Sequence, residues 1–266
     1  MLIADLPQNE EQRLEALRSY KILDTLPEEE YDSITKIAAE ICDTPIALVS
    51  LIDAKRQWFK SRYGLNVTET PRDFAFCAHS ILEPNELFII PDATKDPRFF
   101  DNPLTTDIPN VVFYVGAPLI TQEGYALGTL CVIDNKPRNT ITDGQQESLL
   151  ALSKQVVSQF NLRKKNIYLE QKNKEITRLN NDLSQFAYRL SHDLKTHLRG
   201  ISHLAHFIKE EFKGLNTYNE QIYEWVNLIA SKSCYVESMV EKILNYTKST
   251  QSNIQAESLN LCLKVL

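Results

Sequence analysis

The spacing of apolar residues changes near residue 160 and divides the chain into two parts. In the first part, short apolar runs alternate with clusters of Pro, Asp and Asn, which favours strands joined by loops. The expected strands lie at 45–53, 56–61, 87–92, 113–121 and 125–134. Amphipathic spacing predicts helices at 11–23 and 31–42 and a third helix that begins near Thr142, with Thr142-Asp143 as its cap. These elements together predict an α+β domain built on an antiparallel sheet.

The second part of the chain has a helical period. A leucine or isoleucine recurs every seventh residue, at Leu162, Leu169, Ile176, Leu183 and Leu190, and such a repeat favours a left-handed coiled coil. Beyond residue 183 the apolar stripe continues in steps of three and four, breaks at a predicted turn around 213–216, and resumes at Ile222. This pattern predicts a hairpin of two long helices. Because one hairpin leaves its stripe half covered, we expect two copies to dimerise into a four-helix bundle.

Composition and charge narrow the class of protein. The net charge of −6 argues against a nucleic-acid partner, and 43% hydrophobic with 24% charged residues is typical of a globular protein. The longest apolar run, 111–120, is too short for a membrane span, and the N-terminus lacks the features of a signal peptide. Five cysteines without a CxxC pair indicate reduced thiols. We therefore expect a cytoplasmic protein with no membrane span.

The residue with the clearest chemical potential is His192. It lies two positions from Leu190 and from Leu194, about 200° around the helix, and is therefore expected to face solvent. The residues expected on the same face are Lys195, Thr196 and Arg199. An exposed imidazole can accept a phosphoryl group, nearby cations can stabilise its charge, and the adjoining Asp193 can orient the ring or take its proton. Such a histidine is more often simply solvated, so these residue types leave both interpretations open.

Other histidines suggest a metal site only weakly. His203 and His206 are three residues apart and can share a helix face. No cysteine or carboxylate stands nearby at a spacing that supplies a third ligand. We therefore expect no metal site.

The sequence around His192 resembles a known family. Residues 186–201, FAYRLSHDLKTHLRGI, resemble the phosphoacceptor box of sensor histidine kinases, and 233–249 resemble the second helix of the same dimerisation and phosphotransfer domain. The resemblance implies that His192 is phosphorylated, that Asp193 is its acid–base partner, and that Thr196 positions water in the reverse, phosphatase reaction. Lys195 and Arg199 remain the candidates that assist the phosphate. His197 replaces the family's helix-bending proline, which implies a straighter helix.

The first part of the chain resembles the GAF sensory modules that precede bacterial histidine kinases. The segments PIALVSLIDAKRQWFKSRYGL and FYVGAPLITQEGYALGTLCVID belong to a run over about 10–160 that carries this resemblance. It implies a six-stranded antiparallel sheet and a pocket that can take a small ligand, which the resemblance does not name. Tetrapyrrole-binding members attach their chromophore at a cysteine–histidine pair just before the strand at 111–119, and LTTDIPNVVFYV contains neither residue. We therefore expect Cys77 to be a small buried core residue.

The resemblance also implies an organisation and a set of partners. The expected parts are a GAF domain (1–160), a coiled-coil signalling helix (161–182), the phosphoacceptor domain (183–250) and the start of a truncated ATP-binding domain (251–266). No cofactor is expected in this chain, since ATP and Mg would bind the missing domain, supplied in cis or in trans. The expected partners are a second copy and a response-regulator receiver domain. Two alternatives stay open: a non-catalytic dimeric adaptor, and a phosphorelay intermediate that receives phosphate from an aspartate.

Overall fold

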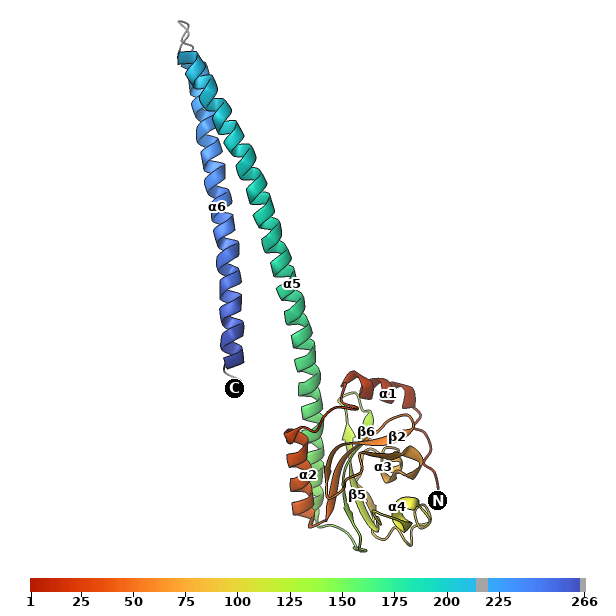
Figure 1. The fold of residues 1–266 in the computed structure, drawn as a ribbon. Helices are drawn as coiled ribbons and strands as arrows, with labels where there is room; N and C mark the ends of the chain where they lie inside the picture. Colours follow the sequence, from red (N-terminus) through yellow and green to blue (C-terminus); the bar gives the residue numbers. More distant parts are fainter. Residues whose placement is uncertain (214–219, 264–266) are drawn as a thin grey trace. The chain divides into compact units, whose positions relative to one another are not determined.

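The computed structural model describes residues 1–213 and 220–263 and contains two compact units. Unit 1 is Met1–Tyr168, and unit 2 begins at Leu169. The helix α5 (Asp143–Lys213) begins in unit 1 and continues into unit 2, where α6 (Glu220–Leu263) follows (Figure 1). The boundary between the units therefore falls inside one continuous helix.

Unit 1 is built on a six-stranded antiparallel sheet with the order β3-β2-β1-β6-β5-β4. Its strands are β1 (Ile46–Ile52), β2 (Arg56–Tyr63), β3 (Glu69–Pro71), β4 (Phe88–Ile90), β5 (Phe113–Ile120) and β6 (Ala126–Asp134). The predicted α+β class is confirmed. All five predicted strands are present, and the three-residue β3 was not predicted. The strand predicted at 87–92 ends earlier, at Ile90, because Pro91 has no N–H to donate to a sheet ladder.

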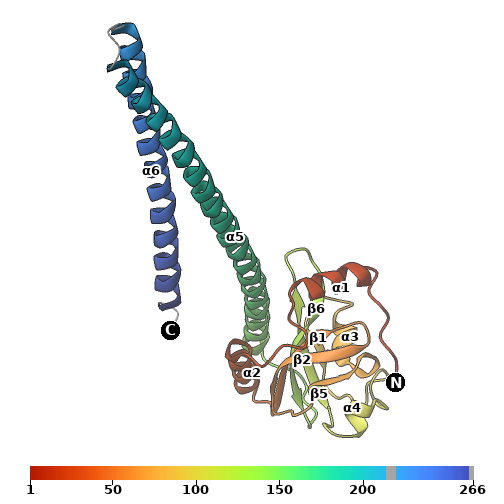
Figure 2. The ribbon, with the colours of Figure 1, turned by 45° about the horizontal axis from the view of Figure 1, so that its top comes forward.

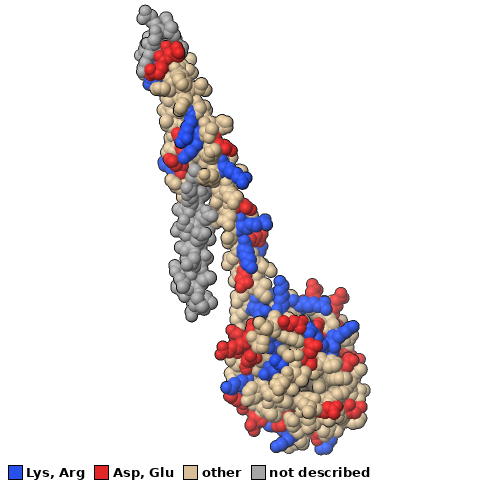
Figure 3. Space-filling view, in the orientation of Figure 1, with Lys and Arg blue, Asp and Glu red and all other residues tan. Residues whose placement is uncertain are grey.

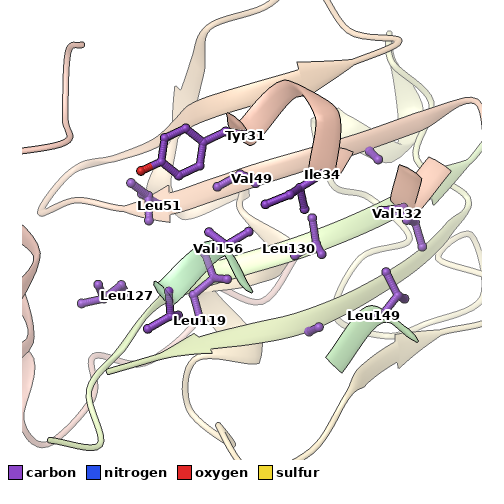
Figure 4. Packing of buried hydrophobic residues seen from close by; sticks show 14 of the residues in the cluster. Tyr31, Ile34, Val49, Leu51, Leu119, Leu127, Leu130, Val132, Leu149 and Val156 are labelled. Carbon is purple, nitrogen blue, oxygen red and sulfur yellow. The ribbon is translucent and has the colours of Figure 1, made fainter. Parts of the chain in front are cut away.

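Helices cover both faces of this sheet, as Figures 1 and 2 show. The helices of unit 1 other than α5 are α1 (Glu10–Ser19), α2 (Glu29–Cys42), α3 (Phe76–Ser80) and α4 (Pro103–Thr106). On one face, Tyr31 and Ile34 of α2 and Val156 of α5 pack against strand residues (Figure 4). On the other face, α3 brings Phe76 into a second buried cluster. Coverage of both faces explains why the central strands β1 and β6 are buried along their whole length.

The ends of two helices follow from local chemistry. The helix predicted at 11–23 ends at Ser19 because Lys21 takes a left-handed conformation with φ of 50°, which no helix can continue. At the start of α5, the Thr142 hydroxyl accepts from the Gln145 backbone N–H at 3.3 Å and the Gln145 side chain accepts from the Thr142 N–H at 2.9 Å. This reciprocal pair is a capping box and confirms the predicted cap.

In unit 2, α5 and α6 lie antiparallel. Lys195 on α5 pairs with Glu241 on α6, and Lys209 pairs with Asn227, so residue numbers rise on one helix as they fall on the other. The residues buried at this seam are small or short: Ser191, Ala205, Val226, Ser233 and Val240. The predicted helical hairpin is present, and the predicted turn at 213–216 lies largely outside the described residues.

The end of α6 and the exposed stripe of α5 bear on two expectations for the C-terminal part. Residues 251–263, which were expected to begin an ATP-binding domain, form the end of α6, and 264–266 lie outside the described residues, so that domain assignment stays a prediction. The apolar stripe of α5 is not covered within one chain, since Leu183 is 60% exposed and Leu190 is 46% exposed. The coiled coil and the four-helix bundle therefore stay predictions.

Candidate functional site

The histidine on α5 stands in an exposed position next to a carboxylate. The His192 side chain is 71% exposed, and its Nδ1 lies 3.3 Å from Oδ1 of Asp193. The helix places the two side chains as sequence neighbours, and neither is held by the hairpin seam. The ring can donate its Nδ1–H to Asp193, which leaves the Nε2 lone pair directed to solvent.

The other predicted site residues are engaged elsewhere. The Thr196 hydroxyl donates to the backbone oxygen of His192 at 3.0 Å, a bond to the preceding turn of its own helix. Lys195 Nζ lies 3.2 Å from Glu241 Oε1, and Arg199 Nε lies 3.5 Å from Glu237 Oε1. The structure thus brings His192 and Asp193 together and directs the two cations to carboxylates of α6.

Sequence reasoning missed these two carboxylates. Glu237 and Glu241 are four residues apart on α6 and therefore share one face, which was the available signal. His203 and His206 are exposed, and in the part of the chain that the structure describes no three His, Cys, Asp or Glu side chains are grouped to hold a metal ion.

A cavity of about 230 Å³ lies in unit 1, on the sheet face that carries α3 and α4. Three polar side chains line it: Gln57, Thr70 and Tyr114. The Gln57 amide Nε2 donates to the Ser50 hydroxyl at 2.8 Å, and its Oε1 accepts from the Thr70 hydroxyl at 3.2 Å. Sequence reasoning missed these residues, although a glutamine inside a buried strand was a usable signal.

Cys77 does not line this cavity and is completely buried, as predicted. Its Sγ is 3.1 Å from the Ser50 hydroxyl, and burial raises the pKa of the thiol to about 12. The thiol is therefore protonated near neutral pH and unreactive. Phe76, the residue before Cys77 on α3, is also buried and lines the cavity.

Three elements meet at a second charged cluster in unit 1. Lys60 of β2 is completely buried, and its Nζ donates to Glu28 Oε1 at 2.5 Å and to the Leu26 carbonyl at 2.7 Å. The same Glu28 oxygen accepts from Arg163 Nη1 of α5 at 2.7 Å. Nearby, the Tyr20 hydroxyl donates to the Asn161 side chain of α5 at 3.1 Å. We call Glu28, Lys60 and Arg163 the exit clamp, because they hold α5 where it leaves the sheet.

The surface of unit 1 shows no field of one sign on the face drawn in Figure 3, where basic and acidic side chains are interspersed. Across residues 1–213 and 220–263, no helix carries a stretch long and apolar enough to cross a bilayer.

The fold and its cavity have the form of a sensory α+β domain, and comparison with known families agrees. A family model described as the GAF domain matches residues 26–160, just over half of the 266 residues. The chain therefore belongs to the GAF-domain family. Residues 1–25, which include α1 and Tyr20, precede the matched region.

A curated relative is similar to part of the chain. The cyclic di-GMP phosphodiesterase PA2567 of Pseudomonas aeruginosa is 37% identical over 165 residues, which is 62% of this chain. The match covers 28% of that protein, so the chain spans less than a third of the length of the relative it matches.

Two solved structures share a weaker likeness. A GAF domain from an Acinetobacter phosphoenolpyruvate-protein phosphotransferase is 16% identical with a TM-score of 0.42 and covers 59% of this chain and 95% of its own. A domain of a putative two-component sensor histidine kinase protein from Sinorhizobium meliloti 1021 is 16% identical with a TM-score of 0.41. It covers 54% of this chain and 97% of its own. At these TM-scores, neither likeness adds to the family assignment.

Proposed function

We propose that this chain is the sensory and phosphoacceptor portion of a two-component sensor histidine kinase. In this proposal the GAF domain controls phosphorylation of His192 and the transfer of its phosphate to an aspartate of a response regulator. The observation that supports it best is the exposed imidazole of His192 with the Asp193 carboxylate 3.3 Å away, inside a sequence that resembles a phosphoacceptor box.

The arrangement suits a direct transfer from ATP bound to a separate kinase domain. The Nε2 lone pair attacks the γ-phosphorus, an N–P bond forms, and the bond from phosphorus to the bridging oxygen breaks. The leaving ADP takes that electron pair, and Asp193 accepts the Nδ1 proton of the imidazolium. Transfer onward reverses these roles, with an aspartate oxygen of the receiver domain as the new acceptor.

The cations beside His192 fit this scheme through an exchange of partners. Lys195 and Arg199 face Glu241 and Glu237 across the hairpin at 3.2 and 3.5 Å, and ion pairs that are partly open to solvent, as these are, contribute little to stability. A phosphoryl group on His192 carries more charge than a carboxylate and competes for the same donors. In the proposal, phosphorylation draws the two cations from α6 towards the phosphate. The Thr196 hydroxyl is the candidate that positions water when the phosphate is removed.

The proposed sensory role has more support than the proposed phosphotransfer. The family model supports a GAF domain whatever its output, whereas the curated relative is named as a cyclic di-GMP phosphodiesterase and gives no support to a histidine kinase. The proposed chemistry needs ATP, a kinase domain and a receiver domain, which places the protein in the cytoplasm. The exposed apolar stripe of α5 supports a homodimer. A dimeric adaptor without phosphate on His192 is the competing function.

The test is phosphorylation of the full chain by a separately supplied ATP-binding domain with radiolabelled ATP. We expect acid-labile, base-stable label on the wild-type chain and none above background on His192→Gln. His197→Gln is the matched control, because it removes another exposed histidine five residues along the same helix and should keep wild-type labelling. Asp193→Asn should slow labelling by about 100-fold, as expected for loss of a proton acceptor.

Each alternative has its own result. Label that persists on His192→Gln contradicts the acceptor assignment. Label that comes only from a phosphorylated receiver domain, and never from a kinase domain, identifies a phosphorelay intermediate. A chain that dimerises and takes label from neither donor is an adaptor.

A further inference from the structure

The cavity on the α3 and α4 face of the sheet has a definite chemical character. Of the thirteen described residues that line it, ten are apolar, and none carries a charge. Burial raises the pKa of the Tyr114 phenol well above its ordinary value, so this hydroxyl is neutral as well. An anionic or cationic ligand placed here would lose its hydration without gaining a counter-charge. The lining thus selects for uncharged molecules.

Size sets a second limit. The cavity measures about 230 Å³, whereas an apolar cavity of about 150 Å³ in another protein accommodates benzene. If the six carbon atoms of benzene are scaled by the ratio of the two volumes, this cavity holds about nine non-hydrogen atoms. A substituted ring or a branched chain of that size fits, and a nucleotide or a tetrapyrrole does not.

Gln57 gives the cavity lining a hydrogen-bonding group. Gln57 is only 5% exposed, and its carboxamide has two N–H groups and two acceptor lone pairs on its oxygen. The bond to Ser50 uses one of the N–H groups, and the bond from Thr70 uses one of the lone pairs. These two bonds hold the amide in place, and the remaining N–H and lone pair are available to a ligand. A hydroxyl, carbonyl or ring N–H on the ligand matches them.

The opening of the cavity is apolar. Ile108 is 95% exposed and Val67 is 48% exposed, and both belong to the cavity lining. They come from different loops, one after α4 and one after β2. Exposed apolar side chains that border a cavity favour the entry of an apolar molecule and gain burial when it binds.

We propose that this cavity binds one small, uncharged, largely hydrocarbon molecule of about nine non-hydrogen atoms, with a single polar group that hydrogen-bonds to Gln57. The proposal deepens the sensory half of the proposed function and names the class of signal that the GAF domain reads. It does not depend on whether His192 is phosphorylated.

The experiment is isothermal titration calorimetry of the full chain with three probes. Indole is neutral and has nine non-hydrogen atoms with one ring N–H, toluene has no polar group, and benzoate is of similar size but charged. We expect indole to bind with a Kd below about 1 mM, toluene to bind several-fold more weakly, and benzoate not to bind measurably.

Two tryptophan variants at exposed apolar loop positions locate the binding. Val67→Trp adds bulk at the cavity opening and should weaken indole binding at least tenfold. Leu82→Trp is the control, since Leu82 is 37% exposed and does not line the cavity, and it should bind indole as the wild type does. Both positions lie in loops, so folding of the sheet does not depend on either.

Several results would overturn the proposal. These are the absence of indole binding up to its solubility, benzoate binding as tight as indole binding, or equal effects of the two tryptophan variants. Indole titration of His192→Gln separates the two proposals, because that variant should bind indole normally whatever happens to its labelling.

Discussion

At the residue scale, one carboxylate organises the N-terminal part of unit 1. The Glu10 carboxylate on α1 accepts hydrogen bonds from Arg13 at 2.7 Å and from Arg72, which directly follows β3. Arg13 also donates to the Ile52 carbonyl at 2.8 Å. Burial alone would raise the pKa of the Glu10 carboxyl, but the two guanidinium groups lower it to about 2. The ionised form is therefore the one that stabilises the fold.

This pairing predicts a dependence of stability on pH. A carboxyl whose pKa is depressed in the folded chain contributes stability above its ordinary value near 4.5, and that contribution is lost as the pH falls towards 2. We expect Glu10→Gln to lower the free energy of unfolding by about 2 kcal/mol at pH 7, because it leaves buried guanidinium groups without a counter-charge. The difference from wild type should narrow between pH 5 and pH 3 in urea titrations. A difference that stays constant over this range would show that ionisation of Glu10 is not the cause.

At the element scale, the close pairing of β1 and β6 depends on a position without a side chain. Gly128 on β6 lies opposite Leu51 of β1, and a Cβ added there would sit 1.9 Å from the Ser50 carbonyl oxygen. The contact is with backbone, so no side-chain rotation can relieve it. A methyl group at this position must push the two central strands apart.

Two glycine substitutions test this constraint. Gly128→Ala should destabilise unit 1 by about 3 kcal/mol, as severe overpacking does. Gly144→Ala is the matched control, because nothing lies within 4 Å of its added Cβ and it stands in the first turn of α5. Alanine there should be neutral or stabilise by up to about 1 kcal/mol. Urea unfolding of both full-length variants measures the two effects, and equal stabilities would contradict the strand-spacing argument.

The elements differ in how well the sequence predicts them, and the reasons are physical. Long periodic segments such as β5, β6 and α2 were predicted to within a few residues, because their own side chains specify the period. The short α3, α4 and β3 were missed, since they show no period of their own and are held by tertiary contacts. The exposure of His192 followed from helical spacing, whereas the cavity around Gln57 arises from segments far apart in sequence.

At the scale of the whole molecule, the ion pairs of the exit clamp connect the sheet of the GAF domain to α5. Glu28 joins the buried Lys60 of β2 to Arg163 of α5, so a shift of β2 changes the surroundings of the helix that carries His192. Gln57 of the cavity lies on the same strand, three residues before Lys60. A ligand that moves Gln57 therefore acts on the strand that holds the clamp. The proposed sensor needs such a link, because α5 is the continuous element between the two units.

The same scale includes the apolar stripe that one chain leaves exposed. Along α5, Leu183 and Leu190 are seven residues apart and respectively 60% and 46% exposed, which suits a seam between two copies of the helix. We expect the wild-type chain to sediment as a dimer, and Leu183→Glu with Leu190→Glu to raise the dissociation constant at least tenfold, because association would bury charge. Leu26→Glu is the control: Leu26 is 83% exposed, lies in a loop, and should leave the dimer unchanged. Sedimentation equilibrium across micromolar concentrations measures the dissociation constants of the three chains. Equal constants would contradict the proposal that a coiled coil of α5 connects the GAF domain to His192.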